Sequence, residues 1–190
     1  GGRWNSRDPS YDPIVTSLPL ELDGFVHGGY GFSKREFSKP DLQFDYYHDG
    51  IDSGYCYTLV RFDLESLPTT AFIGTASLSI TLEYIAVGAG DVSVEIHRIL
   101  EPWDAESVEY SQAAATSFVD PVSVYTVINE TEAPATLTVE IKQFVEEWLS
   151  GSPNYGLRIK GPHGGYEMRG VASEAGGKAP SLRVEYGYLP

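Results

Sequence analysis

The stretch TASLSITLEYI, Thr75 to Ile85, decides the fold class. Apolar or aromatic residues at even positions alternate with serine, threonine or glutamate at odd positions, which is the period-two pattern of a half-buried β-strand. The predicted core face of this strand consists of Ala76, Leu78, Ile80, Leu82 and Tyr84. One side of this strand is apolar and the other is polar, so the pattern predicts a sheet that packs one face against a core.

The same alternation returns along the chain, in DVSVEIHRI (91–99), TLTVEI (136–141) and SLRVEY (181–186). The glycine-rich segment AVGAGD (86–91) predicts a hairpin that joins the first two strands. The segment KQFVEEWLSG (142–151) changes to helical spacing and ends at Gly151, so it predicts a short amphipathic helix. Many short strands and one helix predict an all-β fold, a jelly-roll β-sandwich with one short α-helix.

The length of 190 residues suits one domain with a sizeable core. Residues 1–20 are rich in proline and serine, and we expect them to form an N-terminal arm, a linker or a first edge. Residues 21–190 form the expected single domain. Residues 104–120 show little periodicity and predict a long connection.

The net charge of −14 excludes several classes of partner. Nucleic acids and anionic membranes both attract lysine and arginine, which this chain has too few of, so we expect neither partner. No apolar run is long enough to cross a bilayer. Cys56 is the single cysteine, so no intrachain disulfide forms; its position on a strand predicts a small buried apolar group.

The stretch FDYYHDGIDSGYCYTLVRF, Phe44 to Phe62, carries the candidate binding residues. If even residues such as Val60 and Phe62 face the core, Tyr55, Tyr57 and Arg61 share the opposite face. A preceding strand would add Gln43 and Tyr47 if it pairs alongside. Sugar rings have apolar C–H faces and polar rims, so this face predicts polysaccharide binding. In the alternative interpretation, residues 1–20 cover these tyrosines, or the tyrosines only decorate a strand.

Two charged segments give further candidates. The basic segment SKREFSK contributes Lys34 and Arg35, which either meet an acidic polymer or form a solvated loop. Asp45, Asp49 and Asp52 lie close together in sequence, and carboxylates are ligands that Ca²⁺ prefers. They predict either a structural calcium site or a solvated acidic loop.

No catalytic motif stands out. The four histidines lack HExxH spacing, and there is no GxSxG turn around a serine nucleophile. We therefore expect a protein that is not itself an enzyme.

Five blocks in fixed order resemble a known family. They are LVRFDLESLP, TASLSITL, VEIHRILEPWDAESVEYSQA, VEIKQFVEEWLSGSPNYGLRIKG and ASEAGGKAPSLRVEYG, between Leu59 and Gly187. They resemble the DNRLRE domain, also described as carbohydrate-binding module family 96 and related to the disaggregatase-related repeats. The resemblance implies a jelly-roll domain, secreted or at the cell surface, that is tethered to other domains of a larger protein. Polysaccharide-degrading enzymes are among such proteins.

The sequence supports two interpretations of function. The first is a noncatalytic carbohydrate-binding module that binds a polysaccharide through surface aromatics. The alternative is a structural or adhesive β-sandwich spacer of a cell-surface protein. A tyrosine face that is open to solvent would favour the first, and a face that is sealed would favour the second.

Overall fold

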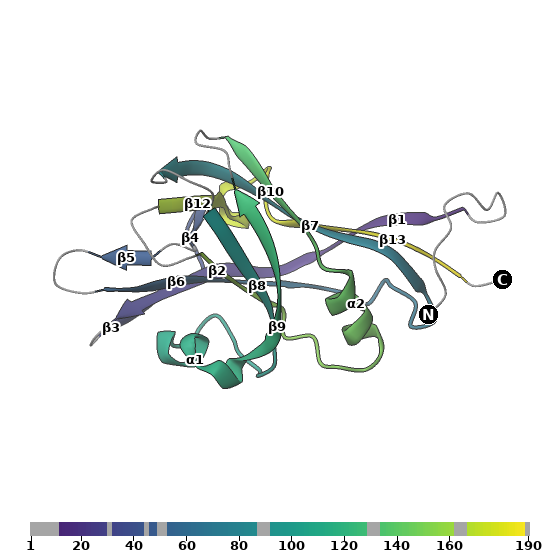
Figure 1. The fold of residues 1–190 in the computed structure, drawn as a ribbon, viewed down its shortest axis with the longest axis horizontal. Helices are drawn as coiled ribbons and strands as arrows, with labels where there is room; N and C mark the ends of the chain where they lie inside the picture. The colour runs from purple at the N-terminus through teal and green to yellow at the C-terminus, as the bar shows by residue number, and fades with distance from the viewer. Residues whose placement is uncertain are drawn as a thin grey trace.

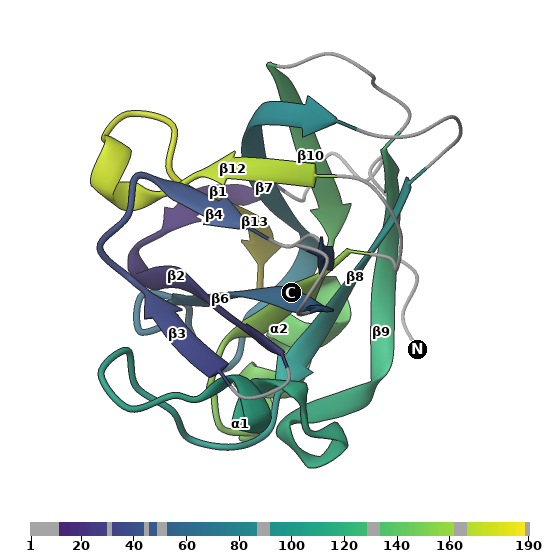
Figure 2. The same cartoon turned by 90° about the vertical axis from the view of Figure 1, so that its left-hand side faces the viewer.

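The computed structural model describes residues 12–29, 32–43, 46–48, 53–86, 92–128, 134–161 and 167–188. Two antiparallel sheets pack face to face, so the predicted all-β sandwich is confirmed (Figures 1 and 2). The layers are held apart by side chains that alternate along each strand, inward to the core and outward to the surface.

The first sheet, here sheet A, runs in the order β1, β13, β7, β12, β4, and β10 pairs with β7 as well. Its strands are β1 (Ile14–Leu18), β4 (Asp41–Gln43), β7 (Phe72–Ala86), β10 (Ala135–Glu140), β12 (Glu167–Val171) and β13 (Ser181–Gly187). The long strand β7 is its centre, because β13 pairs with the first half of β7 and β12 with the second half.

The second sheet, here sheet B, runs in the order β3, β2, β6, β11, β8, β9, and β5 also pairs with β6. Its strands are β2 (Leu20–Gly29), β3 (Phe32–Glu36), β5 (Tyr46–His48), β6 (Ser53–Phe62), β8 (Val92–Ile99), β9 (Val119–Ile128) and β11 (Leu157–Lys160). The two strands expected to form a hairpin, β7 and β8, therefore lie in different sheets, and that prediction is wrong. A short connection between two apolar strands can close a hairpin or cross the sandwich, and strand patterns do not distinguish these outcomes.

The main core lies between the sheets and follows the predicted parity over most of its length. Val60 and Phe62 of β6 meet Leu78 and Ile80 of β7 there, and all are essentially buried. The parity fails at Tyr84, which is 45% exposed, whereas its neighbour Ile85 is buried. Arg169 of β12 pairs with Tyr84 but Gly170 pairs with Leu82, so one extra residue of β7 forms a β-bulge. A bulge reverses which face the following side chains occupy, and this one turns Tyr84 outward.

Gly170 allows this irregular pairing. A β-carbon at this position would lie 2.8 Å from Cγ2 of the core residue Ile80. Glycine therefore lets β12 lie against the bulged part of β7 without displacing the core.

The predicted helix is present as α2 (Lys142–Leu149). It buries Phe144, Val145 and Trp148 in the main core, as its helical spacing predicts. A second short helix, α1 (Tyr110–Ala114), was not predicted; it lies in the expected long connection with the 3-10 turn η1 (Thr116–Phe118). A second such turn, η2 (Ser173–Ala175), follows β12.

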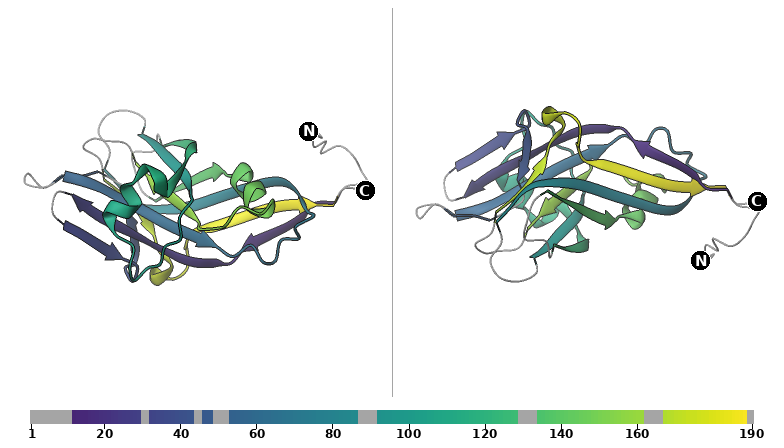
Figure 3. Two further views of the ribbon diagram at one scale, coloured as in Figure 1. Left: turned by 90° about the horizontal axis from the view of Figure 1, so that it is seen from below. Right: turned by 90° about the horizontal axis from the view of Figure 1, so that it is seen from above.

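The sandwich begins before residue 21, so the expected boundary at residue 20 moves toward the N-terminus. Strand β1 pairs with β13 from Ile14↔Tyr186 to Leu18↔Leu182, and Leu18 is buried. Because β1 enters and β13 leaves at the same place, both chain ends of the domain lie at one end of the sandwich (Figures 1 and 3). We call it the terminal end, and the opposite end the far end.

Candidate functional site

The predicted tyrosine face lies on the outer side of sheet B, but half of it is sealed. Tyr57 is only 5% exposed and belongs to a second apolar cluster beneath the sheet. The cover comprises Trp103, Val108, Ala113 and Phe118. Tyr57 therefore cannot stack on a ligand, and its prediction as a contact residue is wrong. We call residues 103–118, which include α1, the cover (Figure 2). The alternative interpretation had expected residues 1–20 to cover the tyrosines.

Several polar contacts hold this segment against sheet B and the loop before β11, among them the following. The Trp103 indole N–H donates to the Tyr155 carbonyl oxygen at 2.6 Å, and the Arg158 guanidinium donates to the Ala113 carbonyl oxygen at 2.6 Å. Arg35 forms an ion pair with Glu109. Such contacts fix a segment that is too short to be a stable helix alone.

The sealed cluster contains a stack of aromatic and cationic groups. The rings of Tyr57 and Tyr110 lie 5.7 Å apart between centroids, and the Arg158 guanidinium carbon lies 4.8 Å from the Tyr57 ring centroid. Burial raises the pKa of Tyr57 well above its usual value and lowers the pKa of Arg158. Both shifts follow from removing a charged form from water.

The other predicted ligand residues whose side chains the structure describes do not form one groove. Arg61 is ion-paired to Glu21 at 2.7 Å, and its guanidinium carbon lies 5.5 Å from the Trp103 ring centroid. Tyr55 is half-buried and stacks beside Tyr57, with the Lys160 ammonium 4.6 Å from its ring centroid.

The segment with Gln43 and Tyr47 divides between the sheets. Gln43 ends β4 in sheet A, whereas Tyr47 lies in β5, which pairs with β6 in register Tyr46↔Tyr55. The sequence predicted that a single strand through Gln43 and Tyr47 pairs with residues 55–64. Only β5 pairs there, whereas Gln43 lies in sheet A and does not join the tyrosines. The side chain of Tyr47 lies outside the described part of the molecule.

The predicted basic cluster is also divided. Lys34 and Arg35 are neighbours in β3, so their side chains leave opposite faces of the strand. Arg35 meets Glu109 of the cover, while Lys34 pairs in register with His27. Burial lowers the pKa of His27, although Glu36 nearby opposes this shift.

The arrangement that does suit a ligand lies on the outer side of sheet A at the far end. Tyr84 of β7, Arg169 of β12 and Gln43 of β4 are register partners in one row across three strands. The Arg169 guanidinium carbon lies 5.5 Å from the Tyr84 ring centroid, and Arg169 is ion-paired to Glu167. We call Tyr84, Arg169 and Glu167 the Tyr84 patch.

All members of the Tyr84 patch reach solvent. The side chains of Arg169 and Glu167 are 44% and 37% exposed. At the end of the row, the Gln43 amide donates to the Asp41 carboxylate at 2.9 Å. An exposed ring thus lies beside a guanidinium and a carboxylate, which is the chemistry that the sequence suggested for the other sheet.

The sequence did not identify Tyr84 as a site residue because it was assigned to the core face. One signal was available: the alternation Ala76, Leu78, Ile80, Leu82 is followed by Ile85, which breaks the period-two pattern. An apolar residue out of phase indicates a bulge, and a bulge exposes the residue before it.

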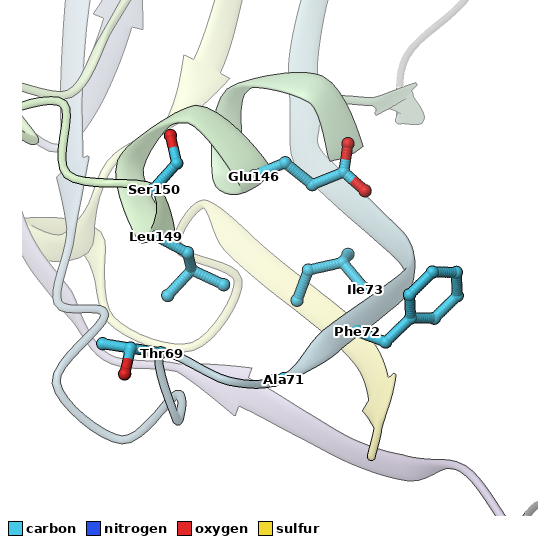
Figure 4. Close-up of a pocket in the computed structure, with 7 residues that line it drawn as sticks. All are labelled: Thr69, Ala71, Phe72, Ile73, Glu146, Leu149 and Ser150. Carbon is cyan, nitrogen blue, oxygen red and sulfur yellow. The ribbon is translucent and has the colours of Figure 1, made fainter. Parts of the chain in front are cut away.

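A small pocket lies elsewhere, between α2 and the loop that precedes β7 (Figure 4). Its volume is about 180 Å³, and it is lined by Thr69, Ala71, Phe72, Ile73, Glu146, Leu149 and Ser150. Ligand pockets usually measure ~300–1,000 Å³, so this hollow is too small for an oligosaccharide.

His97 is a buried histidine that lies near a carboxylate. Its Nδ1 lies 2.7 Å from the Asp120 carbonyl oxygen, and its Nε2 lies 3.8 Å from Glu95. Arg98, next along β8, is ion-paired to Asp120 at 2.7 Å. The hydrogen bonds that Arg98 and the Val122 backbone N–H donate lower the pKa of the Asp120 carboxyl group. These contacts join β8 to β9, so they serve the sheet.

The acidic segment with Asp45, Asp49 and Asp52 falls outside the described residues, so the calcium site remains a prediction. Within the described ranges, no three His, Cys, Asp or Glu side chains gather closely enough to hold a metal ion. No helix in those ranges is long and apolar enough to cross a membrane.

No family model matches the chain, and no curated protein matches it either. The resemblance to the DNRLRE domain is therefore a prediction that rests on the quoted sequence blocks.

Proposed function

We propose that this chain is a noncatalytic carbohydrate-binding module of an exported multidomain protein, and that it binds a polysaccharide at the Tyr84 patch. The observation that carries the proposal is the 45% exposure of Tyr84 in a row with Arg169 and Gln43. Exposed aromatic rings that lie on a sheet and are flanked by polar groups suit sugars, because the ring meets C–H groups and the rim meets hydroxyl groups.

Each member of the patch has a distinct part in this proposal. The uncovered area of the Tyr84 ring stacks on a sugar, while Arg169 stiffens the ring by lying over it and donates N–H groups to hydroxyl oxygens. The Glu167 carboxylate accepts hydrogen bonds from sugar hydroxyl groups. The patch lies on an open sheet face, so it suits the interior of a polymer chain, which can run across it.

The position of the chain ends favours a binding module over a spacer. Ile14 pairs with Tyr186 at the terminal end, and the Tyr84 patch lies at the far end of β7. A larger protein would hold such a domain by one end and present the other end outward. This tethering raises the effective concentration of the parent protein at a polysaccharide. A spacer in series would normally have its connections at opposite ends.

The second candidate is a structural or adhesive module. One observation favours it: Tyr57, which was expected to bind a ligand, is sealed in the second apolar cluster and stabilises the fold. Its partner would then be a protein surface, and no polysaccharide would be retained.

Affinity electrophoresis through gels that contain different polysaccharides tests the proposal. We expect one or more polysaccharides to retard the chain, and we expect Tyr84→Ala and Arg169→Ala to abolish the retardation. Tyr188→Ala is the matched control, because Tyr188 is 51% exposed but follows β13 at the terminal end. Retardation by no polysaccharide, or equal loss in the control, would remove the proposal and favour the second candidate.

A further inference from the structure

We propose that β1 is a docking edge on which two copies of this chain pair, forming a weak two-fold dimer with one continuous sheet. Strand β1 is the last strand of sheet A and pairs only with β13 among the described strands (Figure 3). An edge strand presents unpaired backbone N–H and C=O groups, which another strand can satisfy.

The composition of β1 differs from that of three other edge strands, β3, β9 and β4. The sequence of β1 is IVTSL, with no charged residue and no proline. By contrast, β3 carries Lys34, Arg35 and Glu36. The edge strand β9 contains Asp120 and Pro121, and β4 is only three residues long. Charged residues, prolines and short length keep sheet edges from pairing with other strands. Strand β1 has no charged residue and no proline.

Apolar surface is exposed on both sides of β1. Ile14, on the inner face with Tyr186, is 43% exposed, and Val15, on the outer face, is 48% exposed. A strand added alongside β1 would cover Ile14 on one side and Val15 on the other. Removing this apolar side-chain area from water would favour the pairing.

The register favours a second copy as the occupant. In an antiparallel pair centred on Thr16, Val15 of one copy faces Ser17 of the other, so no charge lies at the two-fold axis. Behind them, Glu185 is the β13 partner of Val15, and Arg183 is the partner of Ser17. Arg183 and Glu185 are ion-paired with each other within one copy, so the strand behind β1 places no unpaired charge from these two residues beside the two-fold axis.

The dimer must be weak. A five-residue strand spans only about 17 Å of ladder, less than the contact of a standard interface. The net charge of −14 on each copy opposes association, and added salt screens this repulsion. Association should therefore strengthen with protein concentration and with moderate salt.

Sedimentation velocity over a concentration series, in low and moderate salt, tests the proposal. We expect a monomer–dimer equilibrium whose dissociation constant rises about tenfold or more in Val15→Lys, because lysine on an edge strand blocks pairing. Val122→Lys is the control, since Val122 is 55% exposed on the edge strand β9; we expect it to leave the dissociation constant unchanged.

Cross-linking gives an independent readout. The natural thiol of Cys56 is 1% exposed, so a short bis-maleimide should link copies of Val15→Cys and not copies of Val122→Cys. A monomer at every concentration up to millimolar, or a dimer that Val15→Lys does not weaken, would overturn the proposal. Either result would mean that something other than a second copy covers the edge, such as residues 1–11 of the same chain or a neighbouring module.

Discussion

The outer faces of the two sheets differ, although both follow the same alternating pattern. On sheet B, Tyr57 and Leu59 point outward from β6 but are sealed beneath α1 and its flanking residues. On sheet A, the outward side chains of Thr136, Thr138 and Arg183 are exposed, and Tyr84 is exposed toward the far end of the same sheet. A side chain that points away from the main core is therefore not always exposed, because a connecting segment from elsewhere in the chain can cover the outer face of a sheet.

The largest expected effect is a difference in the free energy of unfolding between variants of Tyr57 and Tyr84. Tyr57→Ala should lower the free energy of unfolding by about 3–5 kcal/mol, because it opens a cavity in a packed aromatic cluster. Tyr84→Ala should change it by less than about 0.5 kcal/mol, since its ring is largely at the surface. Urea denaturation of both variants measures this contrast. Equal effects would mean that the two faces do not differ as described.

The next effect concerns what fastens the cover. Arg158→Ala removes the hydrogen bond to the Ala113 carbonyl oxygen and the cation that lies over Tyr57. We expect a loss of about 1–3 kcal/mol. Hydrogen exchange should quicken chiefly in residues 103–118. Arg183→Ala, an exposed arginine on sheet A, is the matched control and should change neither measurement. Exchange that quickens evenly over both sheets would contradict this role of Arg158.

A smaller effect appears at alkaline pH. Burial raises the pKa of Tyr57 above its ordinary value of 10.0, so the unfolded chain loses this proton more readily than the folded chain. Above pH ~10 the unfolded state therefore binds fewer protons, and Tyr57 lowers the free energy of unfolding by up to about 1.4 kcal/mol per pH unit. Below pH ~10 this contribution is absent.

The pH effect is measured as the difference between the natural protein and Tyr57→Phe, which lacks the ionisable group. Tyr84→Phe is the control and should keep the natural pH profile. Parallel profiles for the natural protein and Tyr57→Phe would show that water reaches the Tyr57 hydroxyl group.

The fold class could be predicted because period-two alternation is a local signal that the sandwich preserves. The parity of Val60, Phe62, Leu78 and Ile80 matches the structure for this reason. Helix α2 could be predicted because its apolar face has helical spacing and a glycine follows it. The assignment of β7 and β8 to different sheets could not, because the pattern of a strand does not name its partner.

For the proposed binding site, the sequence predicted the types of side chain but not their location. A tyrosine beside a guanidinium and a carboxylate is present on sheet A, and Gln43 is the β4 register partner of that arginine, Arg169. Helix α1 was missed because it is short and held by contacts with Arg158 and Tyr57 that are distant in sequence. Tyr84 was misplaced because a single extra residue in β7 reverses its direction.

Hydrogen exchange with and without a polysaccharide that retards the chain tests the central claim most directly. If the open face of sheet A is the binding surface, protection should rise in the last part of β7 and in β12, with residues 103–118 unchanged. Protection confined to residues 103–118 and β6, with β12 unaffected, would contradict the assignment of the site to Tyr84.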